Sequence, residues 1–148
     1  MSRITRTEYY LRMATLVAER STCCRAQVGA VLTNHNRVVG TGYNGGPAGT
    51  THCEEDGQCT TDKEGRCITT IHAELNAILS REGGFSPEDS LIIYCTHAPC
   101  RHCYKAMVQY GVKEIIYLKY YEDEARDILV SKWKIPITCF NIERVYTI

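Results

Sequence analysis

Apolar residues recur at two different spacings in the first third of the chain. Between Thr7, a suitable N-cap residue, and Ser21 they recur at helical spacing, which predicts an amphipathic helix. The residues on its apolar face are Leu11, Ala14 and either Val17 or Ala18. Residues 28–32 and 37–42 each resemble a strand, and the turn-forming residues at 34–36 lie between them, so this arrangement predicts a β-hairpin.

In the middle of the chain, the pattern predicts two helices with a strand between them. The first helix has His72 and Glu74 in its first turn, and its apolar side is expected to enter the core. The residues on that side are Ile71, Leu75, Ile78 and Leu79. A buried strand at 91–95 and a turn at 96–99 lead into the second helix, which is expected to begin at Cys100 and end at Gly111.

The last third is predicted to hold a strand at 112–118, a helix at 123–134 and a short edge strand at 137–140. Pro136 ends the helix, and its expected core contacts are Ile128 and Leu129. Helices that alternate with strands after a hairpin predict an α/β protein, a three-layer α/β/α sandwich around a central mixed sheet. We expect one domain over residues 1–148, with a polar, cysteine-rich insertion at about 47–70 that has no helical or alternating pattern.

Composition narrows the class of partner. The 148 residues carry 17 basic and 17 acidic side chains, so the formal net charge is zero and large nucleic acids are disfavoured partners. No apolar run is long enough to span a membrane, and the first residues lack the apolar stretch of a secretory signal. We therefore expect a cytoplasmic protein, or one in the host cytoplasm if it is viral. The nine cysteines are then expected to be reduced thiols and metal ligands.

Two short motifs carry the chemistry. His72-Ala73-Glu74 and Pro99-Cys100-Arg101-His102-Cys103 match H-x-E…P-C-x-x-C, the known signature of zinc nucleobase deaminases. Imidazole and thiolate are preferred zinc ligands, and a catalytic site uses three of them so that the fourth position stays open to water. We predict that His72, Cys100 and Cys103 bind catalytic zinc, and that Glu74 transfers protons without binding the metal.

A second group of cysteines lies in and before the insertion. Such a polar segment needs more than burial to fold, and a closed four-ligand zinc site would supply that stability. The preferred ligands are Cys23, Cys53, Cys59 and Cys67, with Cys24 and His52 as substitutes. Alternatively, some of these cysteines are free thiols in a mobile loop. Two other cysteines, Cys95 and Cys139, are expected in the core.

Five stretches of the chain resemble the cytidine deaminase superfamily, and specifically the deoxycytidylate deaminases of bacterial and phage type. They are residues 21–31, 42–45, the cysteine-bearing insertion, 71–78 and 96–103, and together they cover most of residues 7–120. The resemblance implies a central five-stranded sheet and hydrolysis of dCMP to dUMP and ammonia, which supplies thymidylate synthesis. It also implies a homohexamer that dCTP, with Mg²⁺, activates and dTTP inhibits.

The same resemblance implies substrate contacts. Asn44 is expected to hold the deoxyribose or the base, and Arg25 the phosphate, whose oxygens suit an arginine fork. Alternatively, Arg25 forms a surface ion pair and Asn44 only serves its turn. The other expected substrate contacts are Ala73, backbone groups of Thr96 and Ala98, and Tyr120, which would close over the nucleotide. The effector-binding region of the family includes Tyr43, Asn44 and Gly45.

Three other functions share part of this pattern. A tRNA adenosine deaminase has the same motifs but must hold an RNA loop, which the neutral charge and the insertion disfavour. Deaminases of cytidine or cytosine need no phosphate contact, so an Arg25 that lines the pocket would distinguish them. A zinc-stabilised binding module without catalysis would have no need of a free carboxylate such as Glu74.

Overall fold

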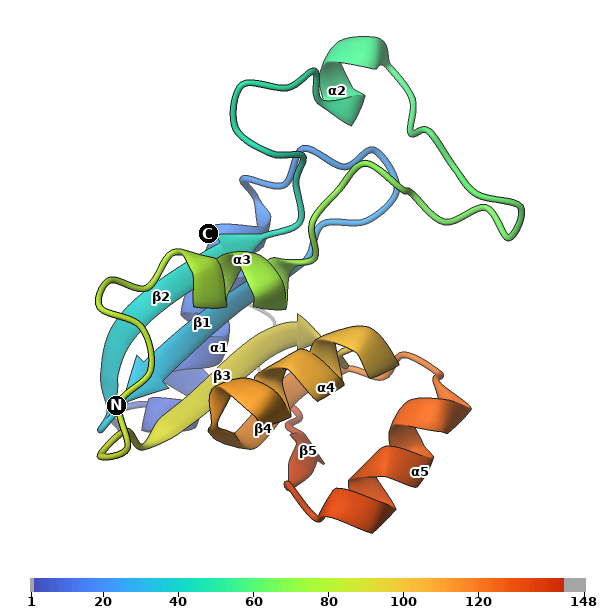
Figure 1. Cartoon of the computed structure of the whole chain (residues 1–148). Coiled ribbons are helices and arrows are strands. Elements are labelled where there is room, and N and C mark those ends of the chain that lie inside the picture. Colours follow the sequence, from blue (N-terminus) through green and yellow to red (C-terminus); the bar gives the residue numbers. More distant parts are fainter. Residues whose placement is uncertain (1, 143–148) are drawn as a thin grey trace.

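A computed structural model describes residues 2–142 of the chain, and its strands form one mixed five-stranded sheet (Figure 1). The strands are β1 (Gly29–Asn34), β2 (Arg37–Tyr43), β3 (Leu91–His97), β4 (Val112–Lys119) and β5 (Ile137–Cys139). Their order is β2-β1-β3-β4-β5; β1 is antiparallel to both neighbours, whereas β3, β4 and β5 are parallel. The predicted hairpin, mixed sheet and edge position of the last strand are confirmed.

Helices cover both faces of this sheet. The helices are α1 (Arg6–Ala18), α2 (Cys53–Asp56), α3 (Ala73–Leu79), α4 (Arg101–Tyr110) and α5 (Glu124–Trp133). Alternate residues of β1 divide between two apolar cores: Val31 packs with α1, whereas Ala30 and Leu32 pack with α3 and α4. The three-layer arrangement expected from the alternation of elements is therefore confirmed, with α5 beside α4 (Figure 1).

The end of α4 agrees with the prediction, whereas the start of α1 does not. The left-handed backbone of Gly111, with φ of 97°, ends α4 as predicted. The N-cap of α1 is Thr5 and not Thr7, because the Thr5 hydroxyl accepts a hydrogen bond from the Glu8 amide at 3.1 Å.

The buried face of α3 differs from the prediction. Leu79 is 72% exposed, while Ala73 and Ala77 are fully buried. The helix lies so close to β2 that a Cβ on Gly42 would come within 2.2 Å of the Ala73 carbonyl oxygen. Only small side chains fit between such closely packed backbones, so the larger apolar residues lie at the sides of the helix or outside.

Three further expectations need correction. β3 continues to His97, because that residue still pairs with Lys119 of β4, so the predicted turn at 96–99 is shorter. Ile128 is 59% exposed, and of the two expected core contacts on α5 only Leu129 packs against the core. Cys139 is exposed on the short edge strand, whereas Cys95 is buried as expected.

The insertion extends away from one end of the sheet, above α3 in Figure 1. Its only helix within the described residues is the single turn α2, and a β-bridge joins Thr61 to Cys67. Backbone hydrogen bonds between Gly45 and Ile71 join the residues just before and just after the insertion. None of the helices in residues 2–142 has the length and apolar character needed to cross a lipid bilayer.

Candidate active site and metal centre

His72, Cys100 and Cys103 come together at the N-terminal ends of two neighbouring helices. The His72 Nδ1 atom lies 3.5 Å from the Cys100 sulfur and 3.3 Å from the Cys103 sulfur, and the three ligand atoms all lie within 4.8 Å of one another. A tetrahedral zinc ion separates a nitrogen and a sulfur ligand by about 3.6 Å and two sulfurs by about 3.8 Å. The predicted ligand set therefore fits zinc in chemistry and spacing.

The local fold explains this convergence. His72 is the N-cap of α3 and Cys100 is the N-cap of α4, so each immediately precedes the first residue of its helix. Cys103 lies in the first turn of α4 and is buried. Because β3 leads directly into the start of α4, the strand sets both cysteines at the end of the sheet, where the helix N-terminus favours thiolate.

The thiols of Cys100 and Cys103 differ in acidity. A hydrogen bond from the Cys103 thiol, with help from His72, lowers the pKa of Cys100 to about 3. The same bond and burial raise the pKa of Cys103 above its ordinary value. The hydrogen bond to Cys100 raises the pKa of His72. One sulfur is thus readily a thiolate, and a divalent cation would displace the protons that remain.

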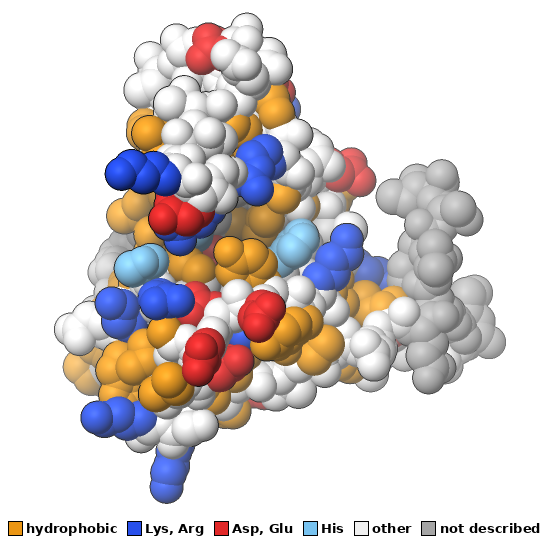
Figure 2. Space-filling model, turned by 90° about the vertical axis from the view of Figure 1, so that its right-hand side faces the viewer, with side chains coloured by type: hydrophobic (Ala, Val, Ile, Leu, Met, Phe, Trp, Pro, Cys, Tyr) orange, Lys and Arg blue, Asp and Glu red, His pale blue; other side chains and the backbone are white. Residues whose placement is uncertain are grey.

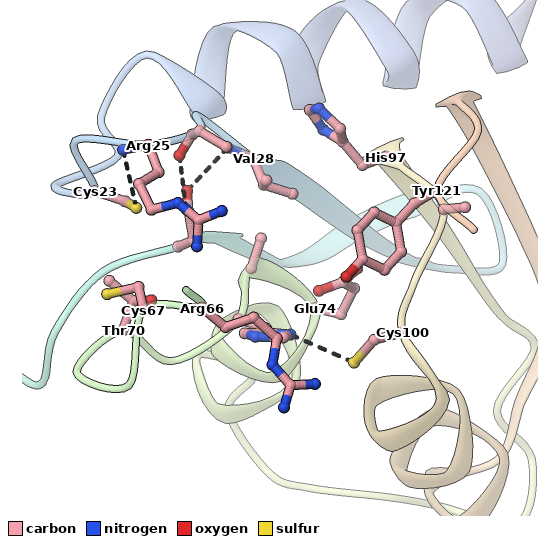
Figure 3. A pocket seen from close by; sticks show the side chains of 15 residues that line it. Cys23, Arg25, Val28, Arg66, Cys67, Thr70, Glu74, His97, Cys100 and Tyr121 are labelled. Atoms are coloured by element: carbon pink, nitrogen blue, oxygen red, sulfur yellow. Dashed lines mark hydrogen bonds between the residues drawn. The ribbon is translucent and has the colours of Figure 1, made fainter. Parts of the chain in front are cut away.

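Glu74 lies in the first turn of α3, beside this centre but not within the three-ligand group. Its residue is only 4% exposed, and burial raises the pKa of its carboxyl group. Figure 3 shows the carboxyl directed into a cavity, between Cys100 and the ring of Tyr121. The carboxyl is therefore placed to exchange protons with a molecule in that cavity.

The cavity has a volume of about 270 Å³ and connects the metal centre to the insertion (Figure 3). On the face shown in Figure 2, basic side chains and two histidines surround a hollow. The residues of the predicted sites that line the cavity are Cys23, Arg25, Asn44, Cys67, His72, Ala73, Glu74, Ala98 and Cys100. The lining residues that we did not predict include Val28, Arg66, Thr70 and Tyr121. Val28 and Thr70 carry no chemical signature that would have marked them in the sequence.

Asn44 lines this cavity, but the surrounding backbone uses its amide group. The side-chain oxygen accepts a hydrogen bond from the Val28 amide at 2.9 Å, and the nitrogen donates to the Ala26 carbonyl at 2.8 Å. Its backbone carbonyl accepts from Ser21 and Thr22. The alternative that Asn44 serves its turn therefore has direct support, and these contacts hold the segment that carries Arg25.

The neighbouring candidates for the effector region also hold backbone. The Tyr43 carbonyl accepts a hydrogen bond from the Asn76 side chain at 2.9 Å, and Gly45 pairs with Ile71. This segment thus connects the end of β2 to the residue that precedes His72.

The expected backbone contacts at the end of β3 divide between the cavity and the core. Ala98 lines the cavity, while its amide donates to the Lys119 carbonyl at 2.8 Å. Thr96 is buried and does not line the cavity; its hydroxyl accepts from the Gly29 amide at 3.0 Å and contacts the His97 ring. His97 lines the cavity itself, and burial lowers the pKa of its imidazole.

Tyr120, which was expected to close over the nucleotide, does not line the cavity. It is 61% exposed, and its hydroxyl contacts Asp127 at 3.4 Å outside the cavity. Tyr121 lines the cavity instead, with its ring facing Glu74 (Figure 3). Since β4 ends at Lys119, strand alternation does not determine which of the two rings turns inward.

Two arginines line the cavity near the insertion. Arg25 was expected there, and its guanidinium donates a hydrogen bond to the Gly65 carbonyl. Arg66 was not expected; it forms ion pairs with Asp62 at 2.9 Å and with Glu64 at 3.2 Å. No pattern in the sequence marks Arg66, because its position depends on how the insertion folds.

The second cysteine group also converges. The sulfur atoms of Cys23 and Cys59 lie 3.7 Å apart, and those of Cys53 and Cys67 lie 3.6 Å apart. The sulfurs of Cys23, Cys59 and Cys67 all lie within 4.8 Å of one another. Cys53 is not within that distance of all three, but it adjoins the group through its contacts with Cys59 and Cys67, and the four thiols are called the cysteine cluster. These distances are close to the sulfur separation of about 3.8 Å in a tetrahedral zinc site. Among the described residues, the substitute ligands Cys24 and His52 are not part of this cluster.

The thiols of this cluster differ in acidity. Burial and hydrogen bonds to the other cysteines raise the pKa of Cys59 to about 12. Burial also opposes ionisation of Cys67, but hydrogen bonds from Thr69 and Thr70 together outweigh it and lower the pKa of this thiol to about 6. As at the first centre, one thiolate forms easily and a cation would displace the other protons.

Comparison with known proteins identifies the family. Residues 4–119 match the family described as the cytidine and deoxycytidylate deaminase zinc-binding region. The chain belongs to this family. The match takes in both motifs that contribute to the metal centre, His72-Ala73-Glu74 and Pro99-Cys100-Arg101-His102-Cys103.

Individual relatives agree with this assignment. The chain is 41% identical over 122 residues to ComE operon protein 2 of Bacillus subtilis; the match covers 82% of this chain but spans only 64% of the Bacillus protein. It is 36% identical to the deoxycytidylate deaminase of Mycobacterium phage D29, over 80% of this chain and 98% of that protein. The dCMP deaminase of cyanophage S-TIM5, solved in complex with dCMP and dUMP, superposes with a TM-score of 0.73 at 28% identity, over 93% of this chain and 98% of that one.

Proposed function

We propose that this deaminase converts dCMP and water to dUMP and ammonia. The observation that carries the proposal is that Arg25 and Arg66 line the same cavity as Glu74 and the metal centre. A cavity of about 270 Å³ approaches the range of about 300–1,000 Å³ typical of small-molecule sites. Relatives named deoxycytidylate deaminase, and a similar structure solved with dCMP and dUMP, support the same substrate.

His72, Cys100 and Cys103 would hold the catalytic zinc, since their donor set and spacing fit the metal. Zinc in such a site supplies Lewis-acid chemistry that activates water at neutral pH. The remaining steps belong to side chains of this chain.

Glu74 is the proton carrier of the proposed reaction. Its carboxylate takes one proton from the water as the oxygen bonds to C4 of cytosine, and passes that proton to ring nitrogen N3. It then takes the second proton from the new C4 hydroxyl and delivers it to N4, so that the C4–N4 bond breaks, ammonia leaves and the C4 carbonyl of uracil forms. Burial raises the pKa of this carboxyl, so the group holds a proton more readily than an exposed glutamate does, as a residue that both accepts and donates protons requires. A carboxyl with this placement also argues against a purely structural zinc module.

The base and the phosphate would occupy different ends of the cavity. Tyr121 offers an aromatic surface on which the cytosine ring can pack beside Glu74 (Figure 3). Arg25 and Arg66 lie toward the insertion, where their guanidinium groups can bind a phosphate through paired hydrogen bonds. Without a phosphate in the cavity, Arg66 forms ion pairs with Asp62 and Glu64. A nucleoside or free base would leave both arginines without this ligand.

The cysteine cluster would bind a second, structural zinc ion through Cys23, Cys53, Cys59 and Cys67. Four sulfurs leave no open position, so this metal would stabilise the fold and have no role in the reaction. Because Cys23 and Cys67 are close in sequence to Arg25 and Arg66, the same ion would also fix the segments that carry both arginines.

A substrate panel tests the proposal. The purified protein is incubated with deoxycytidine, dCMP, dCTP and an adenosine-containing tRNA stem-loop, and released ammonia is measured. We expect dCMP to give the highest kcat/KM. Arg25→Met and Arg66→Met should each raise the KM for dCMP by about 10- to 100-fold, the effect of losing a hydrogen bond to a charged group, and leave deoxycytidine unaffected.

Arg37→Met, an exposed change on β2, is the matched control and should leave both substrates unaffected. Preference for deoxycytidine or for the stem-loop would contradict the proposal. So would an unchanged KM for dCMP in both pocket variants.

Regulation and assembly stay predictions of the family resemblance: activation by dCTP with Mg²⁺, inhibition by dTTP and a homohexamer. A cytoplasmic location stays a prediction from the hydrophobic pattern of the sequence. Initial rates against dCMP with and without dCTP and Mg²⁺ test the activation. A hyperbolic curve that the triphosphate leaves unchanged would contradict it, because allosteric control requires two states that bind the effector unequally.

A further inference from the structure

Arg126, on α5, is a charged side chain that the protein buries almost completely. The residue is 1% exposed, and it does not line the cavity. Burying a guanidinium is costly unless its N–H groups find acceptors. The identity of those acceptors therefore indicates what the side chain does.

One nitrogen of Arg126 connects two walls of the active site. Its Nη1 atom donates to the Pro99 carbonyl at 2.9 Å and to the Tyr121 carbonyl at 2.7 Å. Pro99 immediately precedes the metal-ligand residue Cys100, and Tyr121 lines the cavity. In Figure 3 the ring of Tyr121 and the sulfur of Cys100 lie on either side of the Glu74 carboxyl. Arg126 thus fixes the backbone at two points that flank the proton carrier.

The other nitrogens of Arg126 hold the guanidinium in its orientation. Nε and Nη2 donate to one oxygen of Asp127, at 3.0 and 2.9 Å, and the Tyr120 hydroxyl contacts the second oxygen at 3.4 Å. The ring of Tyr120 lies 5.6 Å from the guanidinium carbon. Tyr120, which does not reach the cavity, is therefore part of the support behind it.

A second hydrogen bond connects the starts of α4 and α5. Asp123, the N-cap of α5, accepts a hydrogen bond from the Arg101 amide at 2.8 Å, and Arg101 is the first residue of α4. The start of α5 is therefore tied to the start of the helix that carries both cysteine ligands. Asp123 therefore connects α5 to α4 without Arg126. What Arg126 contributes in addition is a hydrogen bond that fixes the backbone of Tyr121 relative to these two helices.

Stability alone does not account for a buried arginine at this position. Apolar side chains of similar volume often stabilise a fold as well as a buried ion pair does, whereas a planar guanidinium fixes several acceptors at set distances. We propose that Arg126 is a positioning residue, which sets the separation between the Cys100 segment and Tyr121 and thereby aligns the substrate base with Glu74.

The kinetic part of this inference rests on the proposed function, so the experiment includes a readout that needs no substrate. Arg126→Lys and Arg126→Met are compared with Arg81→Met. Arg81 is also a buried arginine in an ion pair, at 2.7 Å from Asp89, but it does not line the cavity. Each variant is assayed for kcat and KM with dCMP, zinc content, melting temperature and amide hydrogen exchange.

We expect both Arg126 variants to keep their zinc and to lose kcat by about 10- to 100-fold, the effect of a small misplacement of reacting groups. Lysine should restore melting temperature but not kcat, because one ammonium does not reproduce the fork. Amides in residues 98–104 and 119–122 should exchange about tenfold faster or more in both variants, with unchanged exchange there in Arg81→Met.

The outcomes separate the two proposals. If the unaltered protein deaminates no member of the substrate panel, the proposed function fails, and faster exchange confined to the two segments still supports the positioning role. Unchanged exchange in both segments would overturn that role. So would kcat values that follow melting temperature alike in all three variants, or failure of both Arg126 variants to fold while Arg81→Met folds.

Discussion

At the scale of single residues, the role of Glu74 depends on a carboxyl group that is buried beside the metal ligands but is not one of them. Glu74→Gln keeps the shape of the side chain and removes its ability to carry a proton. We expect kcat to fall by about 10²- to 10⁴-fold, with zinc content unchanged. Steady-state assays with dCMP and metal analysis of the same preparation measure both quantities.

The matched control is Glu82→Gln, which removes an exposed carboxylate a few residues after α3. It should leave kcat unchanged. Near-normal turnover in Glu74→Gln would contradict the proton-transfer role, and loss of zinc would instead indicate that the carboxyl supports the metal site.

Residues with a strong chemical signature could be predicted from the sequence, and residues that depend on the path of a loop could not. His72, Cys100 and Cys103 have a fixed spacing and scarce side-chain chemistry, and the structure brings them together as expected. Tyr121 and Arg66 belong to common residue types, and each lies in the cavity only because of how an irregular segment turns. For that reason the sequence did not distinguish Tyr120, which lies outside the cavity, from Tyr121.

At the scale of secondary-structure elements, the separation between α3 and β2 sets the position of Glu74. A Cβ on Gly42 would lie 2.2 Å from the Ala73 carbonyl oxygen and 2.3 Å from the Ala77 amide nitrogen. Gly42→Ala should therefore push the helix outward and destabilise the fold by about 1–3 kcal/mol, the usual effect of overpacking. Urea unfolding followed by circular dichroism measures this change.

The same substitution should lower kcat, because Ala73 is next to both His72 and Glu74. Thr41→Ala is the control: it adds no atoms, and its side chain is exposed on the adjacent position of β2. If Gly42→Ala is as stable and as active as Thr41→Ala, the close contact does not determine where α3 lies.

Close contacts of this kind also explain which elements were predicted well. The hairpin, the order of helices and strands, and the end of α4 at Gly111 follow from local spacing and turn chemistry. The buried face of α3 did not, since apolar spacing indicated Leu79 while tertiary packing required Ala73 and Ala77. Helical periodicity alone does not report how near a neighbouring backbone lies.

At the scale of the whole molecule, a buried ion pair gives stability a defined dependence on pH. Arg81 follows α3 and lies 2.7 Å from Asp89, which precedes β3. The hydrogen bond from Arg81 lowers the pKa of Asp89 from 3.8 to about 2. A carboxyl with a lowered folded-state pKa stabilises the fold above its unfolded pKa, and this contribution is lost as pH falls toward the folded value.

We therefore expect Asp89→Asn to melt several degrees below the unaltered protein at pH 6. The difference should shrink as pH falls from about 4 toward 2. Calorimetry over this range measures both proteins. A difference that stays constant with pH would show that the ionised form of Asp89 contributes nothing to stability.

The two cysteine-containing centres should respond differently to loss of a ligand. Residues 47–70 are largely polar and exposed, so a metal in the cysteine cluster would supply stability that burial does not. Cys59→Ser should lower zinc content from about two ions per chain to about one and reduce the melting temperature. Cys100→Ala should also lose about one ion, with deaminase activity, but with a smaller change in melting temperature because the core around α4 remains packed.

Cys24→Ser is the matched control, because Cys24 is exposed and lies outside the cluster. It should keep both metals and full activity. One zinc ion per chain in the unaltered protein would contradict the second site. The cluster would then be four reduced thiols, with hydrogen bonds such as that between Cys53 and Cys67 as their contribution to the insertion.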